Sequence, residues 1–227
     1  MKTIAIIPAR GGSKGIPKKN LHPICGKPLI QYCIESLQQS SVDDFFVSTD
    51  CKEIAEFSLK IGSKVIDRPA EISQDNSPTI DCINHAIDNL KLNQNDIILT
   101  IQATNPLISS KDIDTTIFKM RSGIYNTVIS VVEDHGFLWE QDNIYIQPKS
   151  HDPLNRVRRQ DLKPTFRETG SMYASTVANI INEKSNIYGN DKTGYVLIPK
   201  NRSFEIDTYE DVEIIESIIR YNFLKNR

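Results

Sequence analysis

The sequence contains no long apolar run, and it is poor in cysteine, histidine and tryptophan. No stretch approaches the roughly 18 consecutive apolar residues that a membrane-spanning helix requires. The first apolar run is interrupted at Pro8 and Arg10, so it is too short for the apolar region of a secretory signal. We therefore expect a soluble, cytoplasmic protein without a membrane partner.

The four cysteines and four histidines lack the spacing of metal-binding and disulfide motifs. No CxxC pair occurs, which favours reduced thiols over a disulfide framework. No HExxH motif occurs, which argues against a zinc site. The net charge is only −2, and without a basic excess we expect no nucleic acid partner.

The charges are nevertheless unevenly distributed along the chain. Residues 1–34 hold six basic residues and no Asp or Glu, whereas residues 205–216 hold six acidic residues and no Lys or Arg. The first segment is suited to binding an anion and the second to binding a cation.

Short apolar stretches alternate with stretches of helical spacing as far as Val132. The apolar stretches are continuous rather than alternating, which is typical of buried parallel strands. We predict strands at 2–9, 43–50, 63–67, 95–102 and 126–132, and helices at 29–39, 52–61, 79–90 and 111–121. This order predicts a doubly wound α/β fold with a mainly parallel sheet, in a single domain spanning 1–227. The loops at 10–20 and 102–107 would then emerge at the carboxyl ends of strands, where ligands bind in such folds.

The pattern changes after Val132. We predict a small hairpin at 136–147, with its turn at Asp142 and Asn143, and a long irregular arm at 151–168. Long irregular segments in compact domains are often functional or bound to a partner, so the insertion 133–168 is suited to reaching another subunit. We expect the chain to return to the sheet at 171–181 and 193–199, and to end in a helix at 208–224 whose first turns are acidic.

The stretch "IPARGGSKGIPKKN" (7–20) follows the first predicted strand directly. Its three glycines let the backbone approach a ligand closely, so that several N–H groups can point at one oxyanion. Its arginine and lysines add positive charge around them, which suits a triphosphate. The stretch matches neither the P-loop pattern nor the GxGxxG fingerprint, and a solvated basic turn remains the alternative.

This stretch closely resembles the opening motif of the cytidylyltransferases that activate nine-carbon 2-keto sugar acids, the acylneuraminate cytidylyltransferase family. Further segments resemble that family's motifs in the family's order: "VSTD" (47–50), "RPAE" (68–71), "IQATNPL" (101–107), "RRQDLKPTFRETGSMY" (158–173) and "FEIDTYED" (204–211). The resemblance covers nearly the whole chain. It implies a nucleotide-diphospho-sugar transferase-like fold with a small dimerisation insertion, and hence a homodimer.

The resemblance also implies roles for individual residues. The nucleotide CTP would be held by Arg10, Ser13, Lys14, Lys19, Asn20, Arg68, Ser77 and Thr79. The sugar acid would be met by Gln102, Arg159, Arg167 and Tyr173, with Arg159 on an arm that crosses to the neighbouring subunit. A divalent cation, Mg²⁺ or Mn²⁺, would be held by Glu205 and Asp207. The catalytic groups would be Arg10, Lys14, Lys19 and Asp207.

Several positions depart from the family's pattern. Glu205 stands where the family has Asp, so its direct ligation of metal is open, and the alternative for Glu205 and Asp207 is that they cap the last helix. Four departures near the acceptor side are Ala103, Asn105, Thr169 and Ser171. We expect these positions to read the ring substituents of the acceptor, and they leave N-acetylneuraminic, legionaminic and pseudaminic acids all open.

The reaction that the resemblance implies is nucleotidyl transfer. The anomeric hydroxyl of a 2-keto-3-deoxy sugar acid attacks the α-phosphorus of CTP, and pyrophosphate leaves. Such catalysis depends on positioning and electrostatics and needs no covalent enzyme intermediate. Two alternatives are a nucleotidyltransferase for another sugar, either an eight-carbon sugar acid or a sugar-1-phosphate, and a catalytically silent nucleotide-sugar binding module.

Overall fold

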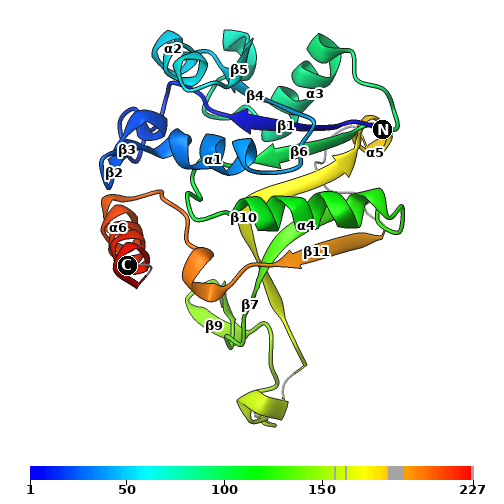
Figure 1. The fold of residues 1–227 in the computed structure, drawn as a ribbon. Coiled ribbons are helices and arrows are strands. Elements are labelled where there is room, and N and C mark those ends of the chain that lie inside the picture. Colours follow the sequence, from blue (N-terminus) through cyan, green and yellow to red (C-terminus); the bar gives the residue numbers. More distant parts are fainter. Residues whose placement is uncertain (156, 162, 184–191, 226–227) are drawn as a thin grey trace.

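The computed structural model describes residues 1–155, 157–161, 163–183 and 192–225. Within them, a seven-stranded sheet forms the centre of the molecule (Figure 1). Its spatial order is β11 (Thr193–Leu197), β7 (Thr127–Glu133), β10 (Phe166–Thr176), β6 (Ile97–Ile101), β1 (Thr3–Pro8), β4 (Asp44–Thr49) and β5 (Lys64–Asp67). β10 pairs antiparallel with both β6 and β7, and the other neighbours pair parallel. The mainly parallel α/β fold is therefore confirmed.

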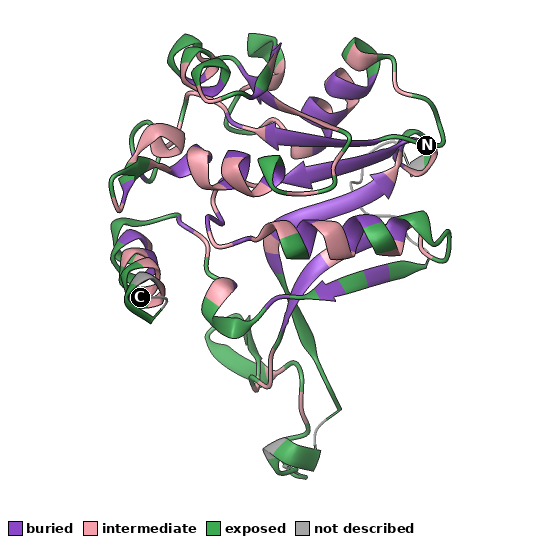
Figure 2. Ribbon diagram, in the orientation of Figure 1, coloured by how far each residue is buried: buried purple, intermediate pink, exposed green. Residues whose placement is uncertain are grey.

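Helices cover both faces of this sheet. One face is covered by α1 (Leu29–Gln38), α2 (Lys52–Lys60) and α4 (Ser110–Arg121), and the other by α3 (Thr79–Leu90) and α5 (Val177–Glu183). In β1, Ala5 and Ile7 pack with the first group, whereas Ile4 and Ile6 pack with the second. A strand buried on both faces has no polar side to present, which explains its continuous apolar run. Figure 2 shows this buried centre.

The last helix, α6 (Tyr209–Lys225), packs beside the opening segment of the chain rather than on the sheet. A small core joins its Val212 and Ile215 to Ile16 and to the two-stranded ribbon β2 (Pro23–Ile24) and β3 (Lys27–Pro28). This packing brings the acidic end of the chain to its basic beginning. Among the described residues, no helix has both the length and the apolar character needed to cross a membrane.

The predicted insertion forms a hairpin, β8 (Trp139–Asp142) and β9 (Tyr145–Pro148), that extends away from the sheet (Figure 1). Its turn lies at Asn143 and Ile144, one residue later than predicted, and Asn143 takes the left-handed φ of 54°. Asparagine tolerates this conformation better than most residues. Figure 2 shows that most of the insertion is exposed.

Two predicted boundaries were wrong. The predicted arm at 151–168 extends too far, because Phe166–Glu168 already belongs to β10 and pairs with Val131–Glu133. The predicted return to the sheet at 171–181 is also too long, because β10 ends at Thr176 and α5 begins at Val177. Val177 and Ile180 are buried against the face that α3 covers, and their three-residue spacing is that of a helix.

Candidate active site

The candidate site lies at the carboxyl ends of β1, β5 and β6, where the fold predicts it. A pocket of about 250 Å³ opens there. It brings together residues from three segments of the chain, 8–10, 68–79 and 102, and five of these residues were expected to bind substrate: Arg10, Arg68, Ser77, Thr79 and Gln102. Pro8, Ile72, Gln74, Asp75 and Pro78 complete the lining. The sequence expectation that the loops after the first and fourth predicted strands share one crevice is confirmed.

The segment that follows β4 holds the opening loop in place. The backbone N–H of Gly11 donates a hydrogen bond of 2.9 Å to Asp50 Oδ1. A Cβ at Gly11 would press on the Cβ of Cys51, at 2.8 Å, so this close approach requires glycine. From the other side, the Asn20 side chain donates to the Arg10 carbonyl oxygen at 3.1 Å. Asn20 therefore holds the loop itself.

Two basic side chains of the loop meet one carboxylate. Arg10 Nη1 lies 2.8 Å from one oxygen of Asp75, and Lys14 Nζ lies 2.8 Å from the other. These two cations lower the pKa of Asp75, with the hydrogen bond from Lys14 contributing most. Lys18 is oriented elsewhere, with its Nζ 2.7 Å from Glu53 on α2. Ser13, between these residues, is half-buried.

Arg68 is the most deeply buried cation of the pocket, with its side chain 6% exposed. The nearest carboxylate, Asp50, lies 4.0 Å from its Nη2. Its Nε and Nη2 have no hydrogen-bond partner in the described part of the chain. Because a buried donor without an acceptor is costly, this guanidinium is suited to an acceptor that a ligand supplies.

Ser77 and Thr79 lie where the loop after β5 enters α3. The Ser77 hydroxyl accepts a hydrogen bond of 3.0 Å from the Gln74 N–H, which shapes the turn before the helix. Thr79 is the first residue of α3, a twelve-residue helix whose N-terminus points at the pocket. Free N–H groups at a helix N-terminus favour negative or electron-rich ligand groups.

Near the C-terminus, Asp207 is in direct contact with the opening loop. Lys19 Nζ lies 2.9 Å from Asp207 Oδ1 and 2.9 Å from the Ile206 carbonyl oxygen. Gly15 packs directly on the Asp207 carbonyl oxygen, where a Cβ would overlap it. The opening loop and Asp207 therefore form one site, although they are far apart in the sequence.

The alternative reading of Glu205 and Asp207 as helix caps is wrong. The Asp211 carboxylate accepts hydrogen bonds from the N–H groups of Asp207 and Thr208, at 3.0 and 2.8 Å, and the Asp211 N–H donates to the Thr208 hydroxyl at 3.4 Å. Thr208 and Asp211 thus form the reciprocal pair that caps α6. The Asp207 side chain, 69% exposed, takes no part in it.

Glu205 is half-buried against an irregularity in β10. The register between β10 and β7 shifts between Glu168 and Tyr173, and Gly170 has a left-handed φ of 66° there. A Cβ at Gly170 would overlap the Glu205 carboxylate, so the glycine makes room for the longer side chain. Burial and then the neighbouring Asp207 raise the pKa of Glu205, while Arg167 and Lys19 oppose the rise. The two carboxylates therefore interact electrostatically across one small region.

This donor set fits a hard divalent cation only in part. No group of three or more His, Cys, Asp or Glu side chains arranged to hold a metal ion occurs among the described residues. A pair of carboxylates suits Mg²⁺, which is commonly held by one or two carboxylates together with substrate phosphates and waters. Asp207 is open to solvent, whereas Glu205 is turned toward Gly170, so Asp207 is better placed for direct ligation.

A buried ion pair, which sequence reasoning missed, supports the segment that precedes Glu205. Arg202 Nη2 lies 3.1 Å from Asp112 Oδ1, and Arg202 Nη1 also bonds the Leu107 carbonyl oxygen at 3.2 Å. The Ile206 N–H donates to the Thr104 carbonyl oxygen at 2.8 Å. These bonds tie the carboxylate segment to the loop after β6. The sequence offered no signal for the pairing.

Asp50 and Asp75 were also missed as site residues. Asp50 ends the "VSTD" stretch and Asp75 follows "RPAE" by four residues, so both lay within or beside motifs noted for resemblance alone. Their partners, Gly11, Arg10 and Lys14, come from a different part of the chain. Only the fold shows which cation each carboxylate meets.

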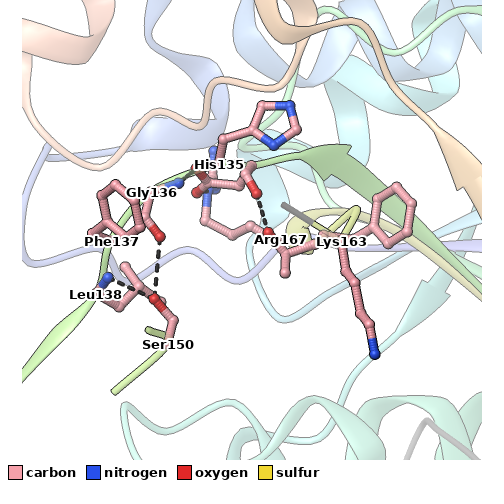
Figure 3. A pocket seen from close by; sticks show the side chains of 10 residues that line it. His135, Gly136, Phe137, Leu138, Ser150, Lys163 and Arg167 are labelled. Atoms are coloured by element: carbon pink, nitrogen blue, oxygen red, sulfur yellow. Dashed lines mark hydrogen bonds and ion pairs between the residues drawn. The ribbon is translucent and has the colours of Figure 1, made fainter. Parts of the chain in front are cut away.

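The residues expected to meet the acceptor are not gathered in one place. Gln102 lines the pocket, and Tyr173 is buried in β10, with its hydroxyl 3.5 Å from Glu168. Arg167 lines a second pocket of about 270 Å³ at the base of the insertion, shown in Figure 3. There Ser150 bridges Gly136 and Leu138. Arg159 begins a short 3-10 helix, Arg159–Asp161, and its side chain lies outside the described residues.

The four positions that depart from the family's pattern do not line the pocket. All are at most 2% exposed: Ala103, Asn105, Thr169 and Ser171. The hydroxyls of Thr169 and Ser171 lie 2.7 Å apart, and both bond the hydroxyl of Ser130, at 2.8 and 3.0 Å. Because the hydroxyl groups of Thr169 and Ser171 are satisfied with Ser130 inside the sheet, the expectation that these two residues read the acceptor is wrong. For Ala103 and Asn105 it stays a prediction, since the buried Asn105 Nδ2 has no hydrogen-bond partner in the described part of the chain.

Known proteins are similar to this chain over nearly its whole length. A family model described as cytidylyltransferase matches residues 4–225. N-acylneuraminate cytidylyltransferase A of Danio rerio is 35% identical over 225 residues, 96% of this chain but 51% of the relative. The chain thus spans about half the length of that relative. Pseudaminic acid cytidylyltransferase of Campylobacter jejuni is 31% identical over 233 residues, 98% of either protein.

A solved structure of CMP:2-keto-3-deoxy-manno-octonic acid synthetase complexed with CTP superimposes with a TM-score of 0.72. The superposition covers 98% of this chain and 100% of that chain, at 20% sequence identity. This likeness shows a common fold and confirms the expected nucleotide-diphospho-sugar transferase-like fold. With a family model spanning nearly all residues and a relative of equal length, this chain belongs to the cytidylyltransferase family.

Proposed function

We propose that this chain transfers CMP from CTP to the anomeric hydroxyl of a nine-carbon 2-keto-3-deoxy sugar acid and releases pyrophosphate. The observation that carries the proposal is the pocket in which buried Arg68, with unpartnered donors, faces the same space as Arg10 and Gln102. Two relatives of this chain are named N-acylneuraminate cytidylyltransferase and pseudaminic acid cytidylyltransferase, which supports this class of acceptor.

The nucleotide would lie with its phosphates on the opening loop. Arg10, Ser13, Lys14 and Lys19 supply donors and charge for the phosphates, while Asn20 keeps the loop in place. Arg68, Ser77 and Thr79 line the end of the pocket where cytosine would lie, and the free donors of Arg68 would meet its carbonyl oxygen. Lys14 and Lys19 would stabilise the charge that develops on the phosphates during transfer.

The metal of this proposal is Mg²⁺ or Mn²⁺. Asp207 would ligate it directly, and Glu205 would act through electrostatics or a bound water. Such a cation supplies neutralisation of phosphate charge and activation of the attacking hydroxyl. Lys19 provides a positive charge beside Asp207.

The acceptor would approach from the side of Gln102, and Arg167 would meet it from the second pocket at the base of the insertion. A planar guanidinium is well suited to the substrate's carboxylate. Arg167 is 56% exposed, and its charge is felt at Glu205, which places it between the carboxylate pair and the insertion.

We further propose that residues 1–227 form one domain and that the insertion 133–168 joins two copies in a homodimer. The insertion exposes large apolar side chains, among them Leu138, Trp139, Tyr145 and Ile146, which a partner would cover. Arg159 would then act at the partner's site. A cytoplasmic location belongs to the same proposal, and the four unpaired cysteines support it.

The test is a panel of nucleotides and sugar acids with Mg²⁺, followed by pyrophosphate release and product mass. The proposal expects product with CTP and one or more nine-carbon acids. Product only with an eight-carbon acid, or only with a sugar-1-phosphate and another nucleotide, would favour the alternative enzymes. Binding of CTP without turnover in every combination would indicate a silent binding module.

The same assay tests the opening loop. Lys14→Ala should lower turnover by about a hundredfold, on the scale of losing one donor to a developing charge. The matched control is Lys18→Ala, because Lys18 lies in the same loop but pairs with Glu53 outside the pocket. Equal losses in both variants would contradict the assignment of Lys14.

A further inference from the structure

A single carboxylate bridges the two cations on which the phosphate assignment rests. Asp75 holds Arg10 with one oxygen and Lys14 with the other, each at 2.8 Å. Phosphate groups bind to arginine and lysine through the same kind of charge-assisted contact to paired oxygens. The Asp75 carboxylate therefore makes the kind of contact with these two cations that an anionic ligand would make.

We propose that Asp75 acts as a displaceable counter-ion of the phosphate site. It keeps Arg10 and Lys14 occupied until a polyphosphate takes its place, and it returns to them when that polyphosphate leaves. The inference rests on the proposed function in that it assigns the phosphates of a nucleotide to these two cations. During turnover, the return of Asp75 to these cations would speed the release of the pyrophosphate product.

The exposure of the contact makes displacement feasible. The side chains of Asp75 and Lys14 are 46% and 82% exposed, so water and salt screen their attraction. A triphosphate brings several negative charges to the same cations and competes well against one carboxylate. If Asp75 stayed in place beside bound phosphates, like charges would repel at close range.

The loop that carries Asp75 does not depend on these ion pairs for its shape. The Gln74 side chain donates to the Ala70 carbonyl oxygen at 2.6 Å, and the Ser73 hydroxyl donates to the Pro69 carbonyl oxygen at 2.9 Å. The Ser77 hydroxyl accepts from the Gln74 N–H. A rotation of the Asp75 side chain can therefore release both cations while the loop keeps its fold.

The chain offers a matched control. Glu53 also pairs with a lysine of the opening loop, Lys18, at 2.7 Å, and it is similarly exposed, at 58%. Neither residue lines the pocket. Removing the charge of Glu53 changes the net charge as much as removing that of Asp75, without freeing either proposed phosphate ligand.

The experiment measures the binding of inorganic tripolyphosphate and pyrophosphate by calorimetry to the wild type and to Asp75→Asn, Asp75→Ala and Glu53→Gln. We expect both Asp75 variants to bind each probe about 2- to 30-fold more tightly at low salt, the range expected for losing two exposed ion pairs that compete. The gain should shrink strongly near about 1 M salt. Glu53→Gln should match the wild type, and pyrophosphate should inhibit turnover more strongly in Asp75→Asn.

Unchanged or weaker binding in both Asp75 variants overturns the proposal, as does an equal gain in Glu53→Gln. Absence of binding in every protein overturns it too. The probes need no turnover, so the result is separate from the proposed reaction. Tighter binding in an inactive chain would reject the reaction alone, and CMP-sugar formation with unchanged binding would reject the role of Asp75 alone.

Discussion

Gly15 is the point at which the two halves of the site touch, and replacing it tests whether that contact matters. A Cβ at Gly15 would overlap the Asp207 carbonyl oxygen. The φ of Gly15 lies outside the left-handed region, so the cost of alanine comes from this overlap rather than from backbone strain. Gly15→Ala therefore separates the opening loop from Asp207 without altering any charge.

The size of the effect follows from the geometry. Carbon and oxygen atoms in contact are ordinarily about 3.3–3.6 Å apart, so the two segments must separate by on the order of 1 Å. The shift also strains the ion pair between Lys19 and Asp207. Because a misplacement of about 1 Å can cost roughly a hundredfold in rate, we expect kcat/KM to fall by about that factor and the Mg²⁺ requirement to rise.

The assay is pyrophosphate release over a range of Mg²⁺ concentrations, with thermal unfolding to check the fold. Gly12→Ala is the control, since a Cβ at Gly12 meets no atom of the described residues within 4 Å apart from its chain neighbours. It should stay close to the wild type. Near-normal kinetics in Gly15→Ala, or an equal loss in Gly12→Ala, would refute the reasoning that contact with Asp207 aligns the site.

Three further predictions concern charges at or beside the site. Asp207→Asn should abolish most Mg²⁺-dependent pyrophosphate release. The control Glu210→Gln, on the exposed first turn of α6, should leave it unchanged. An unchanged metal requirement in Asp207→Asn would count against the metal assignment. Arg68→Met should raise the dissociation constant of CTP about 10- to 100-fold. It should leave the thermal midpoint of unfolding equal or higher, because it removes a buried guanidinium with unpartnered donors. Unimpaired CTP binding would exclude Arg68 as a ligand. Asp112→Asn should lower the free energy of unfolding by about 3 kcal/mol in denaturant titrations, since it leaves Arg202 without its anion, while Glu56→Gln in an exposed pair should change it by less than about 1 kcal/mol. Burial by itself raises the pKa of Asp112, but the contacts with Arg202 and Ser109 outweigh it, so the net shift of the pKa is downward. The wild type should therefore lose this stability as pH falls below about 4, and Asp112→Asn should show a shallower loss.

Much of the fold could be read from local patterns. The strand and helix ranges up to Val132 agree with the structure to within about two residues, because hydrophobic period reports which faces of an element are buried. The errors lie in the insertion and β10, where the pairing of Phe166–Glu168 with β7 depends on contacts across the sheet. A local pattern carries no signal for such pairing.

The candidate site shows the same division. The opening loop, Arg68, Ser77, Thr79 and Gln102 could be named in advance, and the fold gathers Arg10 and the last four of these around one pocket. The departures at Thr169 and Ser171 were expected to face the acceptor, but the structure buries both with Ser130. Whether a polar side chain faces a ligand or the sheet depends on strand register, which the irregularity at Gly170 changes.

The sequence by itself determined the order of strands and helices, the family and the chemistry of the opening loop, since periodicity and side-chain type are local properties. Only the tertiary structure decided which charges meet. Lys19 pairs with Asp207 across 188 positions, and Asp75 bridges Arg10 and Lys14. Arg68 is buried, with its guanidinium 4.0 Å from the Asp50 carboxylate. The strength of the interaction between two charged groups depends on their distance and burial. Both are set by the packing of the fold and not by the order of residues along the chain.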